Sequence, residues 1–226
     1  MSVLPQGFTI TAHTGAMCTR RNSLRSVKKA ADRRCDITEM DVTFRPDGTV
    51  VIIQMEKPAQ TDGVLFEDAL KLVAQSPSIK VNLDLKAFWN TAAVQEAVRR
   101  HGLLERVFYT GVYLGNAEQV RTGSPGIPYY INERIGNDKL DNREYIEQVA
   151  RNITGAGGIG LNSDFRGINA LVVELMHKNG LLVSAWTVNK KKDQLRMLEL
   201  GVDNITTTSP LKLMRLVTRH EALNNK

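Results

Sequence analysis

Acidic residues and a lysine recur two positions apart in two short runs typical of β-strands. Glu39 and Asp41 lie in the first run, and Asp84 and Lys86 lie in the second. Alternate residues of a strand share a face, so each pair lies on one side of its strand. Three inward carboxylates repel one another unless a cation compensates them, and hard oxygen ligands suit Mg²⁺ or Ca²⁺. Spacing alone leaves open an alternative, a buried salt-bridge network of Lys86 with Glu39 and Asp41.

Other polar and aromatic residues stand where further predicted strands end. His13 closes FTITAH, Glu133 closes PYYINE, and Trp186 lies near the end of LLVSAWTV. Taken alone, His13 and Trp186 are better explained as packed side chains than as functional ones. Gln54 closes TVVIIQ, and its amide can accept or donate a hydrogen bond but cannot transfer a proton near neutral pH.

Short β-branched runs alternate with amphipathic helices along the whole chain. Eight main strands are predicted, with TVVIIQ added after a Pro-Asp-Gly turn; they cover 8–13, 36–42, 80–86, 106–112, 128–133, 158–162, 181–188 and 202–208. Helices are predicted after each strand, the first capped by Ser23, the seventh ending at Gly201 and the last beginning at Pro210.

Eight strand–helix steps favour one parallel TIM (β/α)8 barrel, a single domain over residues 1–226. The alternative is a doubly wound open sheet, which rarely needs eight repeats in a chain of about 220 residues. The active site of a TIM barrel lies at the carboxyl ends of its strands. The polar residues named above therefore belong to one region.

Composition sets further limits on function. Hydrophobic residues make up 42% and charged residues 24% of the chain, as in an ordinary globular protein. No run approaches the ~20 apolar residues of a transmembrane helix, the N-terminus lacks the pattern of a signal peptide, and the two cysteines form no disulfide framework. We therefore expect a cytoplasmic protein. The net charge of +6 comes from short basic clusters without interleaved aromatic residues, so no nucleic-acid partner is expected, and the oligomeric state is left open.

Seven short motifs follow one another along residues 10 to 210. They are AHTG (12–15), NS (22–23), EMD (39–41), DGTVVIIQ (47–54), NLDLK (82–86), AWTVN (185–189) and GVDNITTTSP (201–210). In order and spacing this set resembles the glycerophosphodiester phosphodiesterase family, which is a barrel of the kind expected here. The resemblance implies a hydrolase that cleaves a small-molecule phosphodiester with the help of a divalent metal ion.

The resemblance also implies roles for individual residues. His13 matches the first of two catalytic histidines, Lys86 the site lysine and Trp186 the aromatic that lines the pocket, while the metal ligands, for Mg or Ca, are matched by Glu39, Asp41 and Asp84. In the family, the two histidines share the general acid and base roles on the phosphodiester. Glu133 is added to the substrate-binding candidates by its position alone.

Four departures from the family pattern fall on the chemistry. Gln54 stands where the second catalytic histidine belongs. Thr14 replaces an arginine that would bind a phosphate through two parallel hydrogen bonds. Asp84 is one methylene shorter than the family's glutamate, and only about a dozen residues separate Gln54 from the next helix, where the family inserts a capping segment. Arg21 is a candidate to supply the cation that Thr14 lacks.

These departures leave two hypotheses open. The first is a metal-dependent phosphodiesterase, slower or altered in substrate choice, that releases an alcohol and glycerol phosphate and uses His13 as its one proton-transfer group. The second is a non-catalytic barrel that binds a phosphorylated or polar ligand.

Overall fold

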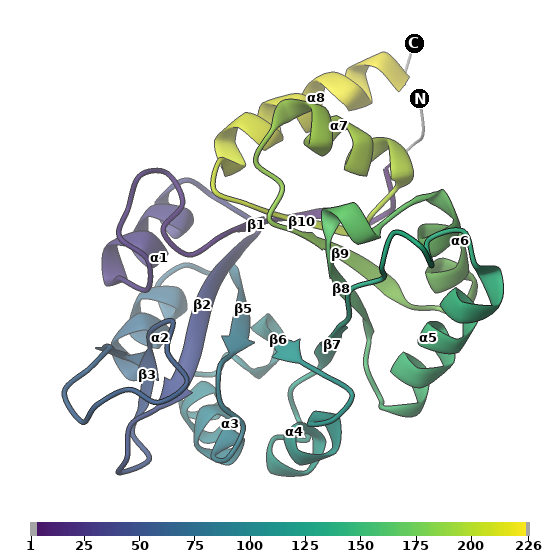
Figure 1. The fold of residues 1–226 in the computed structure, drawn as a ribbon. Coiled ribbons are helices and arrows are strands. Elements are labelled where there is room, and N and C mark those ends of the chain that lie inside the picture. Colours follow the sequence, from purple (N-terminus) through teal and green to yellow (C-terminus); the bar gives the residue numbers. More distant parts are fainter. Residues whose placement is uncertain (1–3, 225–226) are drawn as a thin grey trace.

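The predicted strand–helix steps close into a parallel β-barrel surrounded by helices (Figure 1). This computed structural model describes residues 4–224; residues 1–3 and 225–226 of the predicted domain lie outside the described residues. The ring consists of β1 (Thr9–Ala12), β2 (Ile37–Phe44), β5 (Lys80–Leu85), β6 (Val107–Val112), β7 (Tyr129–Asn132), β8 (Gly160–Asp164), β9 (Leu182–Trp186) and β10 (Asn204–Thr207). Because β1 pairs in parallel with both β10 and β2, the sheet has no free edge in the ring. The TIM barrel is confirmed, and the open doubly wound sheet is excluded.

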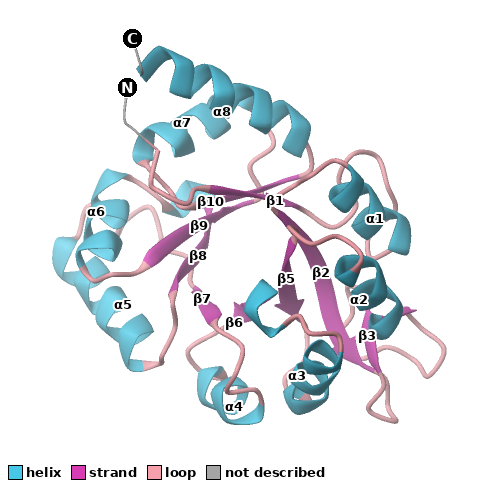
Figure 2. Ribbon diagram, turned by 180° about the vertical axis from the view of Figure 1, so that it is seen from behind, coloured by secondary structure: helices cyan, strands magenta, loops and turns pink. Residues whose placement is uncertain are grey.

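The helices form the outer layer, as the view from behind in Figure 2 shows. They are α1 (Leu24–Asp32), α2 (Phe66–Ala74), α3 (Thr91–Arg100), α4 (Ala117–Gly123), α5 (Arg143–Gly155), α6 (Ala170–Lys178), α7 (Lys191–Leu200) and α8 (Pro210–Asn224), with short 3₁₀ turns at Leu104–Arg106 and Phe165–Gly167. Ser23 caps α1 by accepting a hydrogen bond from the Ser26 amide, and Gly201 ends α7 in the left-handed conformation with φ 77°. Both predicted helix ends are thus confirmed. Within residues 4–224, no helix combines the length and apolar character that crossing a bilayer requires.

A small antiparallel extension rises from the mouth end of β2. Residues 42–44 of β2 pair with β3 (Val50–Ile52), which pairs in turn with β4 (Val64–Leu65). The Ile53 amide then donates a hydrogen bond to the Asp41 carbonyl at 2.9 Å. The strand predicted after the Pro-Asp-Gly turn is confirmed as β3, and the β2–β3 hairpin delivers Gln54 to the mouth of the barrel directly beside the strand that carries the acidic pair.

Two kinds of core lie on the two faces of the barrel strands. Outward-facing aliphatic residues such as Leu83 and Val183 are fully buried beneath the helices. The interior holds hydrogen-bonded amides and hydroxyls instead; for example, Asn162 donates to the Asn132 side chain at 2.9 Å, and Thr11 donates to Asn204 at 3.2 Å. The polar interior leads upward into the site.

Candidate active site

A cavity of about 440 Å³ opens at the carboxyl ends of the strands. Eight of the nine site residues predicted from the sequence line it, from β2, β5, β9 and the loops after β1, β3 and β5: His13, Arg21, Glu39, Asp41, Gln54, Asp84, Lys86 and Trp186. Residues separated by more than 170 positions in the chain therefore share one pocket.

Glu133 does not join this set. Its side chain lines a separate cavity of about 110 Å³ beside α5, together with Tyr145 and Gln148. The reason is the alternation of the strand: Asn132 points into the barrel and lines the mouth cavity, so the next residue turns outward. The structure therefore gives no support to a substrate contact by Glu133.

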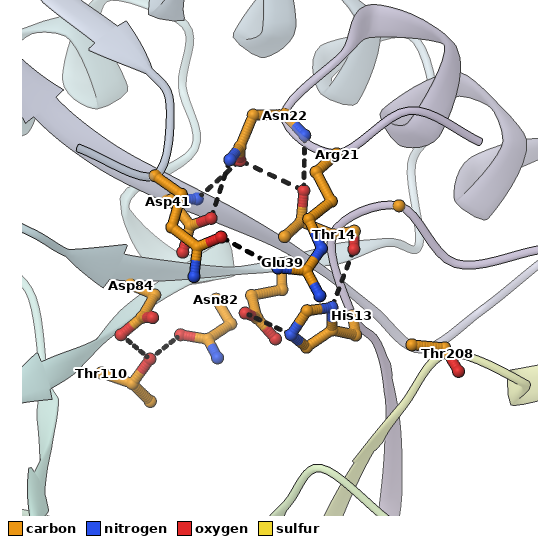
Figure 3. Close-up of polar contacts among 12 residues, drawn as sticks. His13, Thr14, Arg21, Asn22, Glu39, Asp41, Asn82, Asp84, Thr110 and Thr208 are labelled. Atoms are coloured by element: carbon orange, nitrogen blue, oxygen red, sulfur yellow. Dashed lines mark hydrogen bonds and ion pairs between the residues drawn. The ribbon is translucent and has the colours of Figure 1, made fainter. Parts of the chain in front are cut away.

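The three predicted metal ligands converge in the cavity (Figure 3). One oxygen from each of Glu39, Asp41 and Asp84 lies within 4.8 Å of the other two. Lys86 Nζ pairs with Asp41 Oδ1 at 2.9 Å and also with Asp84. The salt-bridge network expected as the structural alternative therefore exists in part, but Lys86 pairs with the two aspartates and not with Glu39.

One lysine cannot balance three carboxylates, of which Glu39 and Asp41 are buried and Asp84 is half-buried. Burial raises the pKa of Glu39 well above its ordinary range, and the charges of Asp84 and Asp41 raise it further. Burial also raises the pKa of Asp84, although the Lys86 ammonium opposes the shift. Conversely, the two aspartates raise the pKa of Lys86 despite its own burial, which keeps it cationic. Fully ionised, the cluster carries two uncompensated negative charges, so its hard oxygen donors and its charge both fit a divalent cation.

His13 is held with one ring nitrogen facing the carboxylates. Nδ1 lies 2.7 Å from the Thr14 carbonyl oxygen, which can only accept, so Nδ1 carries the proton. Nε2 faces Glu39 Oε1 at 3.8 Å. Burial lowers the pKa of His13 below its ordinary value, although the Thr14 carbonyl and the nearby aspartates oppose the shift. At neutral pH, His13 is therefore a neutral imidazole whose Nε2 can accept a proton.

Gln54 and Arg21 meet at the outer edge of the cavity. Arg21 Nη1 donates to Gln54 Oε1 at 2.9 Å, and both residues are exposed. Arg21 also lies close against Gly15, where an added Cβ would come within 2.8 Å of the arginine side chain. Gln54 thus holds the Arg21 guanidinium at the mouth. By the family resemblance, a proton-transfer histidine is expected at this position.

Thr14 has a structural role rather than an anion-binding role. It is buried, and its hydroxyl bonds to the side chain of Asn22 at 3.1 Å while accepting from the Asn22 amide at 2.6 Å. Asn22 in turn donates to Asp41 Oδ2 at 2.7 Å and accepts from the Asp41 amide at 3.0 Å. Figure 3 shows Asn22 joining Thr14 to Asp41. Asn22 therefore orients one carboxylate of the cluster.

The sequence interpretation did not assign roles to several of these residues. Asn22 stands in the sequence as part of the NS motif, and an asparagine just before a helix cap is a signal for local side-chain bonding. Thr110 donates to Asp84 Oδ1 at 3.1 Å from the neighbouring strand. Gly111 has φ 74°, and an added Cβ there would lie 2.4 Å from the Leu85 carbonyl and 2.6 Å from Asp84 Oδ1. No local sequence pattern marks Thr110 or Gly111, because their partners lie on another strand.

Comparison with known proteins identifies the family of this chain. The sequence model of the glycerophosphoryl diester phosphodiesterase family matches residues 56–212. The match begins after His13, Glu39, Asp41 and Gln54, so these residues of the first two barrel strands and the β2–β3 hairpin fall outside it. A glycerophosphodiester phosphodiesterase of Bacillus altitudinis is 23% identical over 86% of this chain and 91% of its own length.

Solved structures share the fold. A phosphodiesterase of Oleispira antarctica in complex with the product sn-glycerol-3-phosphate has a TM-score of 0.77 at 19% identity, over 95% of this chain and 97% of that one. A glycerophosphodiester phosphodiesterase of Parabacteroides distasonis has a TM-score of 0.75 at 17% identity, over 95% and 98% of the two chains. The barrel is therefore shared along nearly the whole chain.

Proposed function

Because this chain belongs to the glycerophosphoryl diester phosphodiesterase family, whose members are phosphoric diester hydrolases, we propose that it cleaves a small glycerophosphodiester-like substrate with a divalent metal ion. The products would be an alcohol and glycerol phosphate. The observation that carries the proposal is the convergence of three carboxylates, one lysine and one neutral histidine in a single cavity.

The metal ion would be held by Glu39, Asp41 and Asp84, with Mg²⁺ or Ca²⁺ as the ion suited to three carboxylates. When bound, such an ion offsets the negative charge that develops on the phosphate oxygens. Asn22 and Thr110 keep two of the three carboxylates oriented through hydrogen bonds of 2.7 and 3.1 Å. Oriented ligands lose less freedom on binding, which favours a preformed site.

The phosphate would lie between Lys86 and Arg21. Lys86 stays cationic because two aspartates raise its pKa. Arg21 is kept at the mouth by its bond to Gln54 and can present the rest of its guanidinium to a phosphate oxygen. Trp186 lines the wall of the same cavity, and the ring closes one side of the space around the substrate.

His13 is the candidate proton-transfer group. Its bond to the Thr14 carbonyl leaves Nε2 unprotonated toward the cavity, so it is set to accept a proton from the attacking water. Gln54 cannot donate a proton to the departing alcohol. We therefore infer an enzyme that is slow on diesters whose alcohol needs protonation and faster on diesters whose alcohol leaves unaided.

The test is an assay of the purified protein on glycerophosphocholine and on an activated aryl diester. Each substrate is measured with Mg²⁺, Mn²⁺ and Ca²⁺ in turn and with a chelator. We expect metal-dependent cleavage of the aryl diester, lost in Glu39→Gln and retained in Glu133→Gln. Glu133 is the matched control, because it is a strand-end carboxyl that lines a different cavity. Equal activity with and without the chelator would contradict the proposal.

A second candidate function is supported by the Arg21–Gln54 hydrogen bond alone. A barrel that keeps its cations and oxygen ligands but lacks a second proton-transfer group could bind a phosphorylated ligand without cleaving it. Isothermal titration with glycerol 3-phosphate separates the two functions. Metal-dependent binding without cleavage of either diester would favour the non-catalytic barrel.

A further inference from the structure

Large apolar side chains gather on one side of the barrel mouth. Six are exposed among the described residues, and four of them lie in the loops after β3, β5 and β6: Met55 (44%), Trp89 (56%), Tyr113 (54%) and Leu114 (41%). The other two lie elsewhere, since Leu65 lines a groove beside α2 and α3 and Leu182 begins β9 at the opposite end of the barrel. The clustering is therefore specific to the mouth.

This apolar surface continues into the catalytic cavity. The loops that carry these side chains lie next to one another, because β3, β2, β5 and β6 are successive strands of the sheet. Phe88 and Tyr113 both line the cavity that holds Lys86 and Asp84. Met55 directly follows Gln54, another lining residue. We call Met55, Phe88, Trp89 and Tyr113 the apolar rim.

The most exposed member of the rim is held in place. The Trp89 ring packs edge-on against Phe44 of β2, with ring centroids 5.0 Å apart and an interplanar angle of 62°. The next residue, Asn90, donates to the Gly48 carbonyl in the β2–β3 turn at 3.1 Å. The loop after β5 is thus tied to the hairpin, and an apolar surface presented by a fixed loop is preorganised for a ligand.

The far wall of the cavity is more polar. Neutral hydrogen-bonding side chains line it from β7, β8 and β10, namely Asn132, Asn162 and Thr206, together with the aromatic ring of Trp186 from β9. A phosphodiester has two alcohol arms, and a phosphate placed between Lys86 and Arg21 separates these two walls. One arm therefore faces the amides, the hydroxyl and Trp186, and the other leaves the cavity over the exposed apolar side chains of the rim.

We propose that the apolar rim binds the alcohol arm that leaves the cavity, so that the preferred substrate is an amphiphilic diester: glycerol phosphate esterified with an apolar alcohol. This inference rests on the proposed function and specifies its substrate class. Contact between the arm and the rim removes apolar surface from water, and each fully buried methylene contributes about a fourfold gain in binding.

The experiment compares the methyl and n-hexyl esters of glycerol 3-phosphate at concentrations where both are monomeric. The readout is the ratio of their kcat/KM values with saturating metal ion. We expect a ratio of about tenfold or more in favour of the hexyl ester, since the five added methylenes are only partly buried on an open rim. The ratio should fall toward one in Trp89→Ala, in Tyr113→Ala and in the double variant. Leu182→Ala is the matched control, an exposed apolar residue at the other end of the barrel, and it should leave the ratio unchanged.

The outcomes separate this inference from the function on which it rests. Metal-dependent cleavage of both esters at equal kcat/KM would overturn the inference and leave the proposed function standing. A hexyl preference that survives in the double variant would also overturn it, because the apolar contact would then lie elsewhere. No cleavage of either ester by the natural protein would count against the proposed function itself. Circular dichroism of each variant shows whether it is folded, and the single variants test the rim if the double variant does not fold.

Discussion

Replacing Gln54 with histidine tests the central chemical argument. The side chain at this position lines the same cavity as His13, and in the natural protein it accepts a hydrogen bond from Arg21 at 2.9 Å. A histidine there would add a group able to protonate a departing alcohol. General acid catalysis contributes about 10²- to 10⁴-fold, so the rate on glycerophosphocholine should rise by a factor in that range.

The substitution also removes the amide that holds Arg21. A net hydrogen bond is worth about 1 kcal/mol, which corresponds to about a fivefold loss on every substrate that uses the guanidinium. Gln54→Ala is the matched control, because it removes the same bond and adds no acid. The acid contribution is the ratio of the histidine variant to the alanine variant.

The assay is kcat/KM for glycerophosphocholine and for an aryl diester, each with saturating divalent ion. An aryl alcohol leaves without a proton, so the ratio of the two variants should stay near one for the aryl diester and rise for glycerophosphocholine. Equal acceleration of both substrates would refute the reasoning. If the natural protein already cleaves both substrates at similar rates, another group supplies the proton, and Glu56, which lines the same cavity, is the first to replace.

Three further predictions concern the support of the site and the chain as a whole. Asn22→Ala should weaken divalent-ion binding by about 10- to 100-fold, measured by calorimetry, because its amide bonds a carboxylate of the cluster at 2.7 Å; unchanged affinity would contradict this. Gly111→Ala should lower the free energy of unfolding in urea by several kcal/mol, because the new Cβ would lie 2.4 Å from the Leu85 carbonyl at a positive φ. Burial raises the pKa of Cys35 to about 11, so this thiol stays protonated until the pH rises through that value, whereas Cys18 is exposed. At pH 8, a thiol reagent should therefore label one cysteine per folded chain and two after unfolding, and rapid labelling of both in the folded protein would refute the assignment.

Local rules were enough to predict most of the fold. The alternation of strand runs with helical periodicity predicts the barrel, and a serine cap and a left-handed glycine predict helix ends that the structure confirms. Each rule involves residues a few positions apart, so a linear sequence contains all the information that the rule needs. The same holds for the acidic pairs, because strand alternation alone places Glu39 with Asp41 on one face.

Contacts across strands could not be predicted in this way. The sequence could not choose between Glu39 and Asp84 as partners of Lys86, because that choice depends on the parallel pairing that sets Asp41 beside Asp84. The bond from Arg21 to Gln54 spans 33 positions and exists because the hairpin after β2 turns back over the mouth. Glu133 was a candidate by its place at a strand end alone, and alternation from Asn132, which lines the mouth cavity, turns Glu133 toward a different cavity.

The sequence by itself therefore determined the barrel, the acidic pairs at its mouth and the glutamine at position 54. Only the tertiary structure decided which charges meet, which carboxyl is turned away and which face of the mouth is apolar. The physical reason is that the two kinds of interaction act over different separations along the chain. Propensity, capping and alternation act between near neighbours in the chain, whereas electrostatic pairing and burial act between near neighbours in space. In a closed barrel, neighbours in space such as β1 and β10 come from opposite ends of the sequence.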